Sequence, residues 1–174
     1  DEIYARLVYD GLTSPSIAAL PGMAERTVVL YTFSKKFAMT GWRLGASIGP
    51  KEVVDVIAKL NVNDESCSNH FIQYGALAGL KGDQTEVQAI LDTLHARRDA
   101  AVDALNAIDG IRSFRPNATF YLFPNVTDVM ERKGMTDYEV FRREVLHATG
   151  VSFTTRLHFG REIPGEANRY IRFA

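Results

Sequence analysis

The sequence predicts an α/β protein in two parts, and three observations carry this prediction. Residues 27–34 form a β-rich run that is apolar without alternation, as in a strand covered on both faces of a largely parallel sheet. Residues 84–108 form a long amphipathic helical stretch, and shorter strand and helix candidates follow it. With 174 residues, 46% of them hydrophobic and 24% charged, the chain is long enough to bury a core.

Charge and cysteine content narrow the class of protein. The formal net charge of -1 gives no electrostatic reason to expect nucleic acid or an anionic membrane surface as a partner. Cys67 is the single cysteine, so an internal disulfide is excluded and a reducing, cytoplasmic location is expected. The apolar runs are too short to span a bilayer, so no membrane partner is expected.

The first part of the chain is expected to hold two strands and two helices. The strands are predicted at 27–34 and 46–49. Pro50 is placed to open a helix over 51–60, because proline is tolerated at the first helical position. A second helix, rich in Ala and Leu, is predicted over 69–80.

The long helix is expected over 84–108, where it bridges the two parts of the chain. Asp83 and Glu86 stand at N-cap and N3 spacing, so they are predicted to cap its first turn. Gly110 follows the helix where a left-handed residue commonly ends one.

The remainder of the chain is predicted to be a small α/β region. A capping-box spacing at Thr136 and Glu139 predicts a helix to Ala148, which Gly150 ends. Short strands are predicted at 119–123, 151–154 and 169–173. The expected domains are residues 1–82 and 83–174.

The strongest chemical signal lies around Lys35, at the carboxyl end of the first predicted strand. Ligands of open α/β sheets bind at this edge. Partial desolvation and a nearby cation are expected to lower the pKa of the Lys35 amine, which makes it a usable nucleophile. Arg43 offers a planar fork suited to a phosphate, and the hydroxyls of Thr32 and Ser34 can donate to the same phosphate.

This stretch resembles the signature of the class I and II aminotransferases, Ser-x-Ser-Lys leading to Gly-Trp-Arg-x-Gly. In that family the lysine binds pyridoxal 5′-phosphate (PLP) as a Schiff base, and an arginine eight residues later holds the PLP phosphate. Lys35 and Arg43 have that separation, whereas Lys36 and Arg43 do not. Thr32 replaces the first serine of the pattern and keeps its hydroxyl. The resemblance therefore assigns the Schiff base to Lys35.

The opening residues resemble the family's Asp-Glu-x-Tyr strand end. The resemblance implies that Asp1 lies beside the pyridine nitrogen of PLP, where a carboxylate favours the protonated, electron-withdrawing ring. It also implies that Tyr4 donates its hydroxyl to the phenolic oxygen of the cofactor.

The last residues resemble the closing strand of the family, Tyr-x-Arg-x-x-x-Ala. Arg172 aligns with the arginine that binds the α-carboxylate of the substrate. Phe159 and Gly160 match the family's Phe-Gly turn, and residues 117–121 are similar to its Gly-Ala-Phe-Tyr strand.

The resemblance spans essentially the whole chain and implies a fold and an activity. The implied fold is part of fold type I: the end of a mixed, mainly parallel seven-stranded large PLP domain, followed by a small α/β domain. The implied activity is transfer of an amino group between an amino acid and a 2-oxo acid by a homodimer. Because the chain opens inside the Asp-Glu-x-Tyr motif, we expect upstream parts of the site to be missing and these 174 residues alone to be inactive.

Two alternatives use the same fold. One is a PLP-dependent lyase, and the other is the aminotransferase-like sensor domain of a transcription regulator. Residues 61–66 lie roughly where dicarboxylate-specific members place a side-chain arginine, and they hold acids and no arginine, which disfavours a dedicated aspartate enzyme. The four histidines show no metal-ligand spacing, so no metal is expected; they are His70, His95, His147 and His158.

Overall fold

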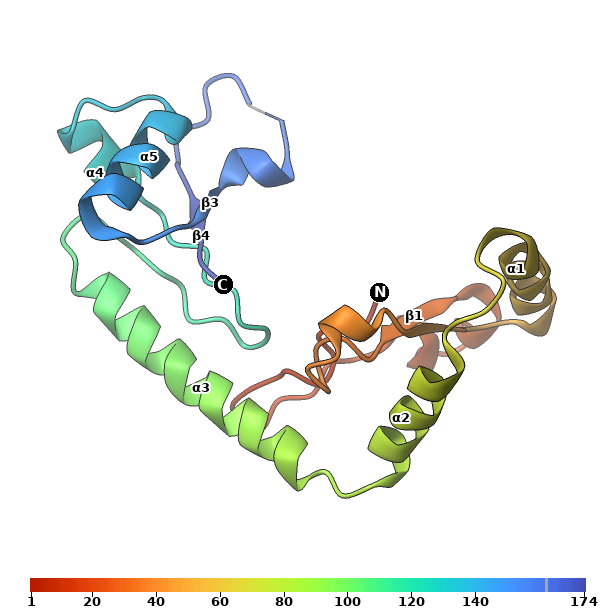
Figure 1. Cartoon of the computed structure of the whole chain (residues 1–174). Helices are drawn as coiled ribbons and strands as arrows, with labels where there is room; N and C mark the ends of the chain where they lie inside the picture. The colour runs from red at the N-terminus through yellow and green to blue at the C-terminus, as the bar shows by residue number, and fades with distance from the viewer. Residues whose placement is uncertain (162) are drawn as a thin grey trace. The chain divides into compact units, whose positions relative to one another are not determined.

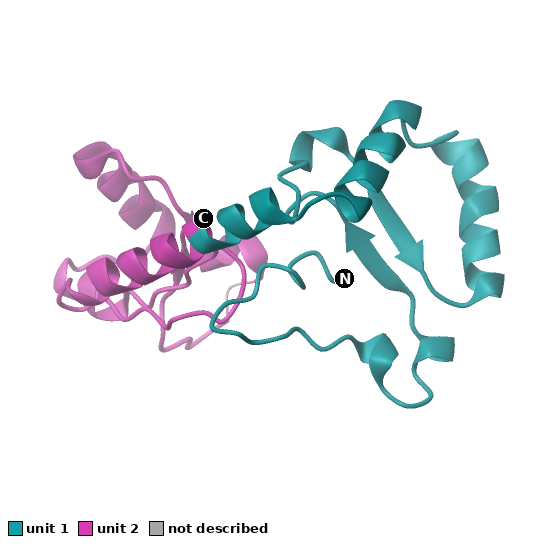
Figure 2. Cartoon of the chain, turned by 90° about the horizontal axis from the view of Figure 1, so that it is seen from below, with its two compact units in different colours: residues 1–92 teal, residues 93–174 magenta. Residues whose placement is uncertain are grey.

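The computed structural model describes residues 1–161 and 163–174, which form two compact units, Asp1–Asp92 and Thr93–Ala174 (Figures 1 and 2). The first unit contains the strands β1 (Val29–Thr32) and β2 (Gly45–Ile48), the helices α1 (Lys51–Asp64) and α2 (His70–Lys81), and the 3₁₀ turns η1 (Ile17–Ala19), η2 (Ala24–Arg26) and η3 (Thr40–Trp42). Helix α3 (Thr85–Asn106) crosses the boundary between the units. The expected domain boundary after residue 82 stays a prediction.

Strands β1 and β2 form an antiparallel pair that runs from Val29 opposite Ile48 to Thr32 opposite Gly45. The predicted strand over 27–34 is therefore shorter, and its partner within the described chain runs antiparallel, as a pair in a mixed sheet can. Leu30 is half exposed, so this chain alone does not cover both faces of the strand. Gly45 suits this close pairing, because a Cβ there would lie 3.0 Å from the Tyr31 carbonyl oxygen, closer than most Cβ contacts.

The helices of the first unit confirm the predicted pattern with small shifts of their ends. Pro50 precedes α1 as its N-cap, and the helix runs on to Asp64, beyond the predicted end. Asn69 is the N-cap of α2. Asp83 accepts a hydrogen bond from the Thr85 backbone N–H at 3.1 Å, so this carboxylate does cap the first turn of α3.

The second unit contains α4 (Thr127–Arg132), α5 (Tyr138–Thr149), β3 (Thr154–Thr155), the 3₁₀ turn η4 (Arg156–Phe159) and β4 (Ile171–Arg172). Helix α4 was not predicted, because six residues are too few to show a helical period. The strand predicted at 119–123 is wrong: that segment makes an isolated bridge between Leu122 and Phe173. Strands β3 and β4 are antiparallel. Strand β3 shares only Thr154 with the strand predicted at 151–154, and β4 is shorter than the strand predicted at 169–173.

The N-cap of helix α5 lies one residue later than predicted. Asp137, rather than Thr136, accepts hydrogen bonds from the backbone N–H groups of Glu139 and Val140, at 2.7 and 3.0 Å. The Glu139 carboxylate pairs with Arg142 one turn along the helix, which replaces the predicted capping box. Gly150 ends α5 in the left-handed conformation, with φ 73°, as predicted.

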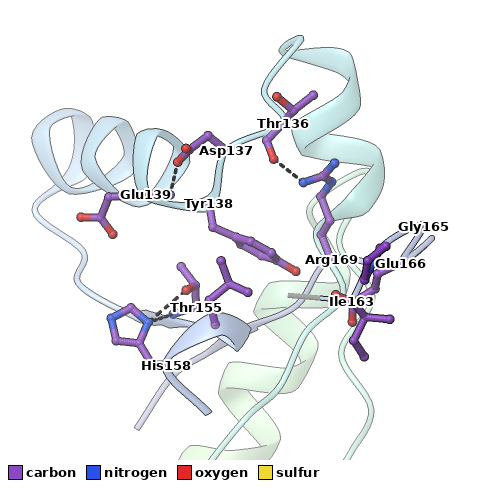
Figure 3. Close-up of a pocket in the computed structure, with 12 residues that line it drawn as sticks. Thr136, Asp137, Tyr138, Glu139, Thr155, His158, Ile163, Gly165, Glu166 and Arg169 are labelled. Carbon is purple, nitrogen blue, oxygen red and sulfur yellow. Dashed lines mark hydrogen bonds between the residues drawn. The ribbon is translucent and has the colours of Figure 1, made fainter. Parts of the chain in front are cut away.

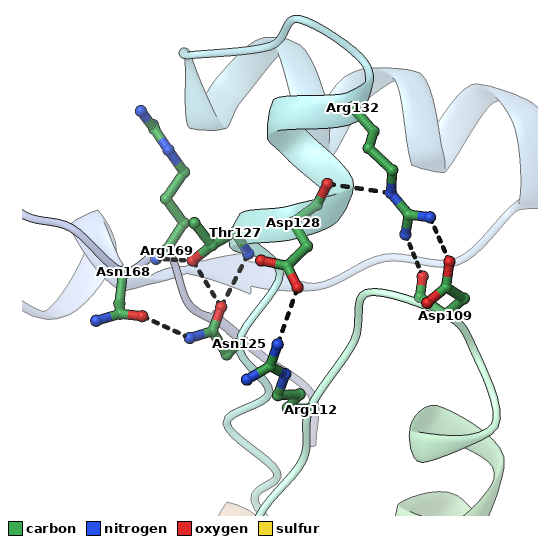
Figure 4. Close-up of polar contacts among 8 residues, drawn as sticks. All are labelled: Asp109, Arg112, Asn125, Thr127, Asp128, Arg132, Asn168 and Arg169. Carbon is green, nitrogen blue, oxygen red and sulfur yellow. Dashed lines mark hydrogen bonds and ion pairs between the residues drawn. The ribbon is translucent and has the colours of Figure 1, made fainter.

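The core of the second unit lies between α4, α5 and the β3–β4 pair. It consists of Val126, Met130, Tyr138, Phe141, Phe153 and Ile171. A polar network beside it joins distant segments (Figure 4): Asn125 accepts from the Thr127 backbone N–H and donates to Asn168, and Thr127 accepts from the Arg169 backbone N–H. This network fixes the start of α4 against the segment that leads into β4.

None of the described helices is both long and apolar enough to cross a lipid bilayer.

Truncation of Met130 to alanine is expected to destabilise the second unit by about 2 to 5 kcal/mol, because it leaves a cavity in the core. Met130 is 0% exposed, whereas Val140 on α5 is 49% exposed. Urea denaturation measures the free energy of unfolding, and Val140→Ala is the control, expected to change it by less than about 0.5 kcal/mol. Equal effects of the two variants would show that Met130 is not a core residue.

Stability is also expected to fall in acid through Glu139. Hydrogen bonds from Arg142, with further attraction from Arg143, hold the pKa of the exposed Glu139 carboxyl at about 2, below its ordinary value of 4.5. Because the folded-state pKa is lowered, this stabilisation is complete above the unfolded pKa and is lost as the pH falls from 4.5 towards 2.

The check is the urea midpoint of Glu139→Gln and of the unchanged protein, compared from pH 7 to pH 2. We expect the difference to be present at pH 7 and mostly lost at pH 2, where the folded-state carboxyl is about half protonated. Glu144→Gln on the same helix is the control, because Glu144 makes no ion pair with the described residues. A pH-independent difference for Glu139→Gln would contradict the pairing.

Candidate active site

Lys35 lies in a loop that a backbone hydrogen bond closes at its base. The Phe33 N–H donates to the Leu44 carbonyl at 3.3 Å, directly beyond the last pair of the β1–β2 register. Lys35 therefore lies near the start of the loop that joins β1 to β2, and Arg43 lies near its end, at the same end of the hairpin. The Met39 N–H donates to the Ser34 carbonyl at 3.0 Å, which folds the loop back on itself. Lys35 itself is half-buried.

Two hydroxyls precede Lys35 and contact one another. The Thr32 hydroxyl donates to Ser34 Oγ at 2.9 Å, and Thr32 Oγ1 accepts from the Ser34 backbone N–H at 3.1 Å. Ser34 is buried, at 8% exposed. The structure thus brings together both hydroxyls that the sequence predicted as phosphate donors.

Arg43 follows the η3 turn and adopts a left-handed backbone conformation, with φ 53° and ψ 51°. This conformation is uncommon for a residue other than glycine, asparagine or aspartate, and such outliers cluster at functional sites. The Arg43 guanidinium donates from Nη1 to the Thr40 carbonyl at 3.0 Å and is exposed. Its other donors have no acceptor in the described part of the chain, so they are available to an anion.

The loop rests on an aromatic layer. Phe33 stacks with Phe37 at 5.9 Å between ring centroids, and Tyr31 meets Phe33 edge-on at 5.2 Å. Gly79 of α2 lies against the Phe37 ring, where an added Cβ would be 3.2 Å from a ring carbon. These contacts fix the two residues that flank the Lys35 turn.

Lys36, the residue after Lys35, packs against an aromatic ring. Its ammonium lies 4.6 Å from the centroid of the Phe37 ring. Partial burial, together with the charge of Arg6, lowers the pKa of Lys36. Lys35 was predicted to be the Schiff-base lysine, in preference to Lys36, only from its separation from Arg43. A chemical test must therefore show which of the two amines binds the cofactor.

Asp1 and Tyr4 lie in a segment that is tied to β1. The Glu2 N–H donates to the Leu30 carbonyl at 2.9 Å, and the Tyr4 carbonyl accepts from the Leu7 N–H at 2.9 Å. The exposed Asp1 carboxylate accepts from the Ile3 N–H at 3.2 Å, while Tyr4 is half-buried. The first unit thus holds all the predicted cofactor-binding residues.

Arg172 belongs to the second unit, in β4. Its guanidinium carbon lies 4.3 Å from the centroid of the Tyr121 ring and 4.0 Å from that of Phe159. Its Nε is buried and has no acceptor among the described residues. A buried donor without an acceptor is costly, so this group calls for an anion. Sequence reasoning missed Tyr121 and Phe159, which were noted only as parts of family-like motifs.

The second unit also has a hollow of about 710 Å³ beside the start of α5 (Figure 3). Arg169 donates to the Thr136 carbonyl at its edge, and the buried Tyr138 hydroxyl accepts from the Tyr170 N–H at 2.9 Å. Burial raises the pKa of the Tyr138 hydroxyl, which keeps it neutral. No predicted site residue lines this hollow.

Comparison with known proteins identifies the family. The sequence profile described as aminotransferase class I and II matches residues 1–161, so the chain belongs to that family. An aspartate aminotransferase of Musicola paradisiaca is 38% identical over 162 residues, covering 93% of this chain and 40% of that protein. A putative aminotransferase of Bacillus subtilis, YugH, is 41% identical over 160 residues, covering 92% of this chain and 40% of that protein.

The fold comparison agrees with the family. The crystal structure of the aspartate aminotransferase from Rhizobium meliloti matches with a TM-score of 0.89 at 29% identity, over 100% of this chain and 44% of that one. The predicted α/β fold class is thus confirmed as part of the aspartate aminotransferase fold. The chain spans about 40% of the length of the curated relatives that it matches.

Removal of the Thr32 hydroxyl is expected to weaken PLP binding by about tenfold, because both hydrogen bonds of the Thr32–Ser34 pair and one candidate phosphate contact are lost. The measurement is the dissociation constant of PLP for Thr32→Val, determined by titration of the natural full-length protein. Thr32→Ser keeps a hydroxyl and is expected to bind within about twofold of the unchanged protein. Equal affinity of Thr32→Val would exclude this hydroxyl from the phosphate site.

Proposed function

We propose that the natural protein containing this chain is a PLP-dependent aminotransferase, which moves an amino group between an amino acid and a 2-oxo acid. The observation that carries the proposal is the closed loop in which Lys35 and Arg43 stand at the same end of the β1–β2 hairpin. Membership of the aminotransferase class I and II family supports the same reaction class.

The residues present fit PLP by the chemistry of their donors. An aldehyde requires an amine, which Lys35 Nζ supplies. A phosphate requires hydroxyl and guanidinium donors, which Thr32, Ser34 and Arg43 supply within one loop and the strand before it. We assign Lys35 to hold the cofactor and the other three residues to hold its phosphate.

Asp1 and Tyr4 complete the proposed cofactor contacts. The Asp1 carboxylate would pair with the pyridine nitrogen, and the Tyr4 hydroxyl would donate to the phenolic oxygen. Bound PLP supplies an electron sink that stabilises negative charge at the α-carbon of an amino acid. Support for the placement of both residues comes from the Glu2–Leu30 hydrogen bond, which ties their segment to β1.

The α-proton and the α-carboxylate of the substrate are assigned to two basic residues. Lys35 Nζ, once it is a free amine, accepts the proton from the α-carbon and later returns a proton, as a general base and then a general acid. Arg172 binds the α-carboxylate, and its buried, unpartnered Nε supports this role. Arg172 thus orients the α-carbon for the proton transfer.

We further propose a homodimer in the cytoplasm, with the domain boundary after residue 82. Support for an additional protein surface comes from large apolar side chains exposed along α1 and α2, among them Val56, Leu60, Phe71 and Tyr74. Apolar groups gathered in this way mark surfaces that other polypeptide covers.

The test is transamination by the natural full-length protein, measured as formation of both the new amino acid and the new oxo acid. Replacement of Lys35 with alanine is expected to reduce turnover by about 10³-fold or more, because the amine that moves the proton is lost. Lys36→Ala is the matched control, since it removes the neighbouring amine, and it is expected to retain turnover.

The reaction products separate the alternatives. Release of an oxo acid and ammonia without any amino acceptor would replace the transferase by a lyase. PLP binding without turnover of any amino acid would favour the sensor domain. Full turnover by Lys35→Ala would contradict the proposed site itself.

A further inference from the structure

The guanidinium of Arg172 is held by aromatic rings instead of by carboxylates. Tyr121 and Phe159 both lie within 4.3 Å of its central carbon, measured to the ring centroids. In the described part of the chain Arg172 has no ion pair, and its Nε is buried without an acceptor. A cation against a ring face is stabilised while its N–H groups, which lie in the guanidinium plane, stay free for a ligand.

The strand register brings Tyr121 to Arg172. Leu122 and Phe173 exchange two backbone hydrogen bonds, N–H to carbonyl, at 3.2 and 3.0 Å. In an antiparallel pair, successive side chains alternate between faces and diagonal neighbours interact. Leu122 and Phe173 therefore point to one face, while Tyr121 and Arg172 share the other. The contact between Tyr121 and Arg172 is therefore fixed by the backbone pairing of the two segments.

A second set of contacts holds Phe159 in place. Phe159 ends η4, and η4 begins with a reciprocal cap in which His158 Nδ1 accepts from the Thr155 N–H at 3.2 Å. Arg156, the first residue of the turn, donates from Nε and Nη2 to the Glu166 carboxylate at 2.8 and 2.6 Å. The Phe159 ring is 52% exposed, so core packing does not explain why the turn is fixed in this way.

We propose that Tyr121 and Phe159 are positioning residues that orient Arg172 for a substrate carboxylate. This inference rests on the proposed function, which assigns the carboxylate to Arg172. The two rings restrict rotation of the guanidinium and exclude water from its faces. The carboxylate then meets donors in one plane, the arrangement that a bidentate pair requires. The two rings act on the carboxylate through Arg172.

Calorimetric titration with propionate, a carboxylate that cannot be transaminated, tests this role in the natural full-length protein loaded with PLP. Tyr121→Leu and Phe159→Leu are each expected to weaken propionate binding by about tenfold, which is the effect of losing one well-packed cation–π contact. Arg172→Lys is expected to weaken it further. Phe159→Tyr restores a ring and is expected to recover most of the affinity.

Two controls separate positioning from damage to the fold. Phe114→Leu removes a ring that is 80% exposed and is expected to leave propionate binding unchanged. The thermal midpoints of the leucine variants are expected to stay near that of the unchanged protein. In turnover with an amino acid, the leucine variants are expected to raise KM by about the same tenfold while kcat changes less, because Lys35 is untouched.

The outcomes distinguish this inference from the proposed function. Weaker propionate binding in both leucine variants and in Arg172→Lys, with recovery in Phe159→Tyr, supports the inference. Unchanged binding in the leucine variants with loss in Arg172→Lys overturns it and leaves the proposed function standing. Unchanged binding in all three variants overturns both the inference and the carboxylate role of Arg172.

Discussion

The hydrogen bond from the Phe33 N–H to the Leu44 carbonyl closes the loop on which the candidate site depends. It continues the β1–β2 register by one pair beyond Thr32 and Gly45. An amine and a guanidinium that are eight residues apart are thereby held at one end of a hairpin, with two hydroxyls on the strand side. Gly45 is part of this arrangement, because a Cβ there would lie only 3.0 Å from the Tyr31 carbonyl oxygen and the strands would have to adjust locally.

In the second unit, too, a backbone register decides which side chains share a face with Arg172, the cation proposed to bind the substrate carboxylate. Pairing of Leu122 with Phe173 sends apolar side chains into the core and leaves Arg172 beside Tyr121. The Arg156–Glu166 ion pair then anchors the turn that carries Phe159. Structural ion pairing and ligand binding are thus divided between two arginines, and the one without a carboxylate partner is the one assigned to substrate.

Features encoded locally were predictable from the sequence. The Lys35–Arg43 spacing, the helices α1, α2 and α5, and the left-handed Gly150 all depend on residues close together in the chain. Features that depend on pairing between distant segments were not predictable from the sequence. The apolar run at 27–34 predicted a strand covered on both faces, but its extent and its antiparallel partner depend on pairing with residues 45–48, which the run itself does not encode.

The features of the second unit that were not predicted also depend on contacts between distant segments. Both Thr136 and Asp137 are good capping residues, and only the backbone path decides that Asp137 takes the position. The rings of Tyr121 and Phe159 meet Arg172 through strand pairing and a capped turn, which leave no periodic signal in the sequence. Membership of the family was nevertheless readable, because the motif around Lys35 is contiguous.

The most direct test of the central claim, that Lys35 is the amine that holds PLP, is borohydride reduction followed by peptide mapping. The natural full-length protein is incubated with PLP, reduced and digested, and the modified peptide is sequenced by mass spectrometry. We predict a phosphopyridoxyl group on Lys35 alone. Modification of Lys36, or modification spread over exposed lysines with none on Lys35, would contradict the account.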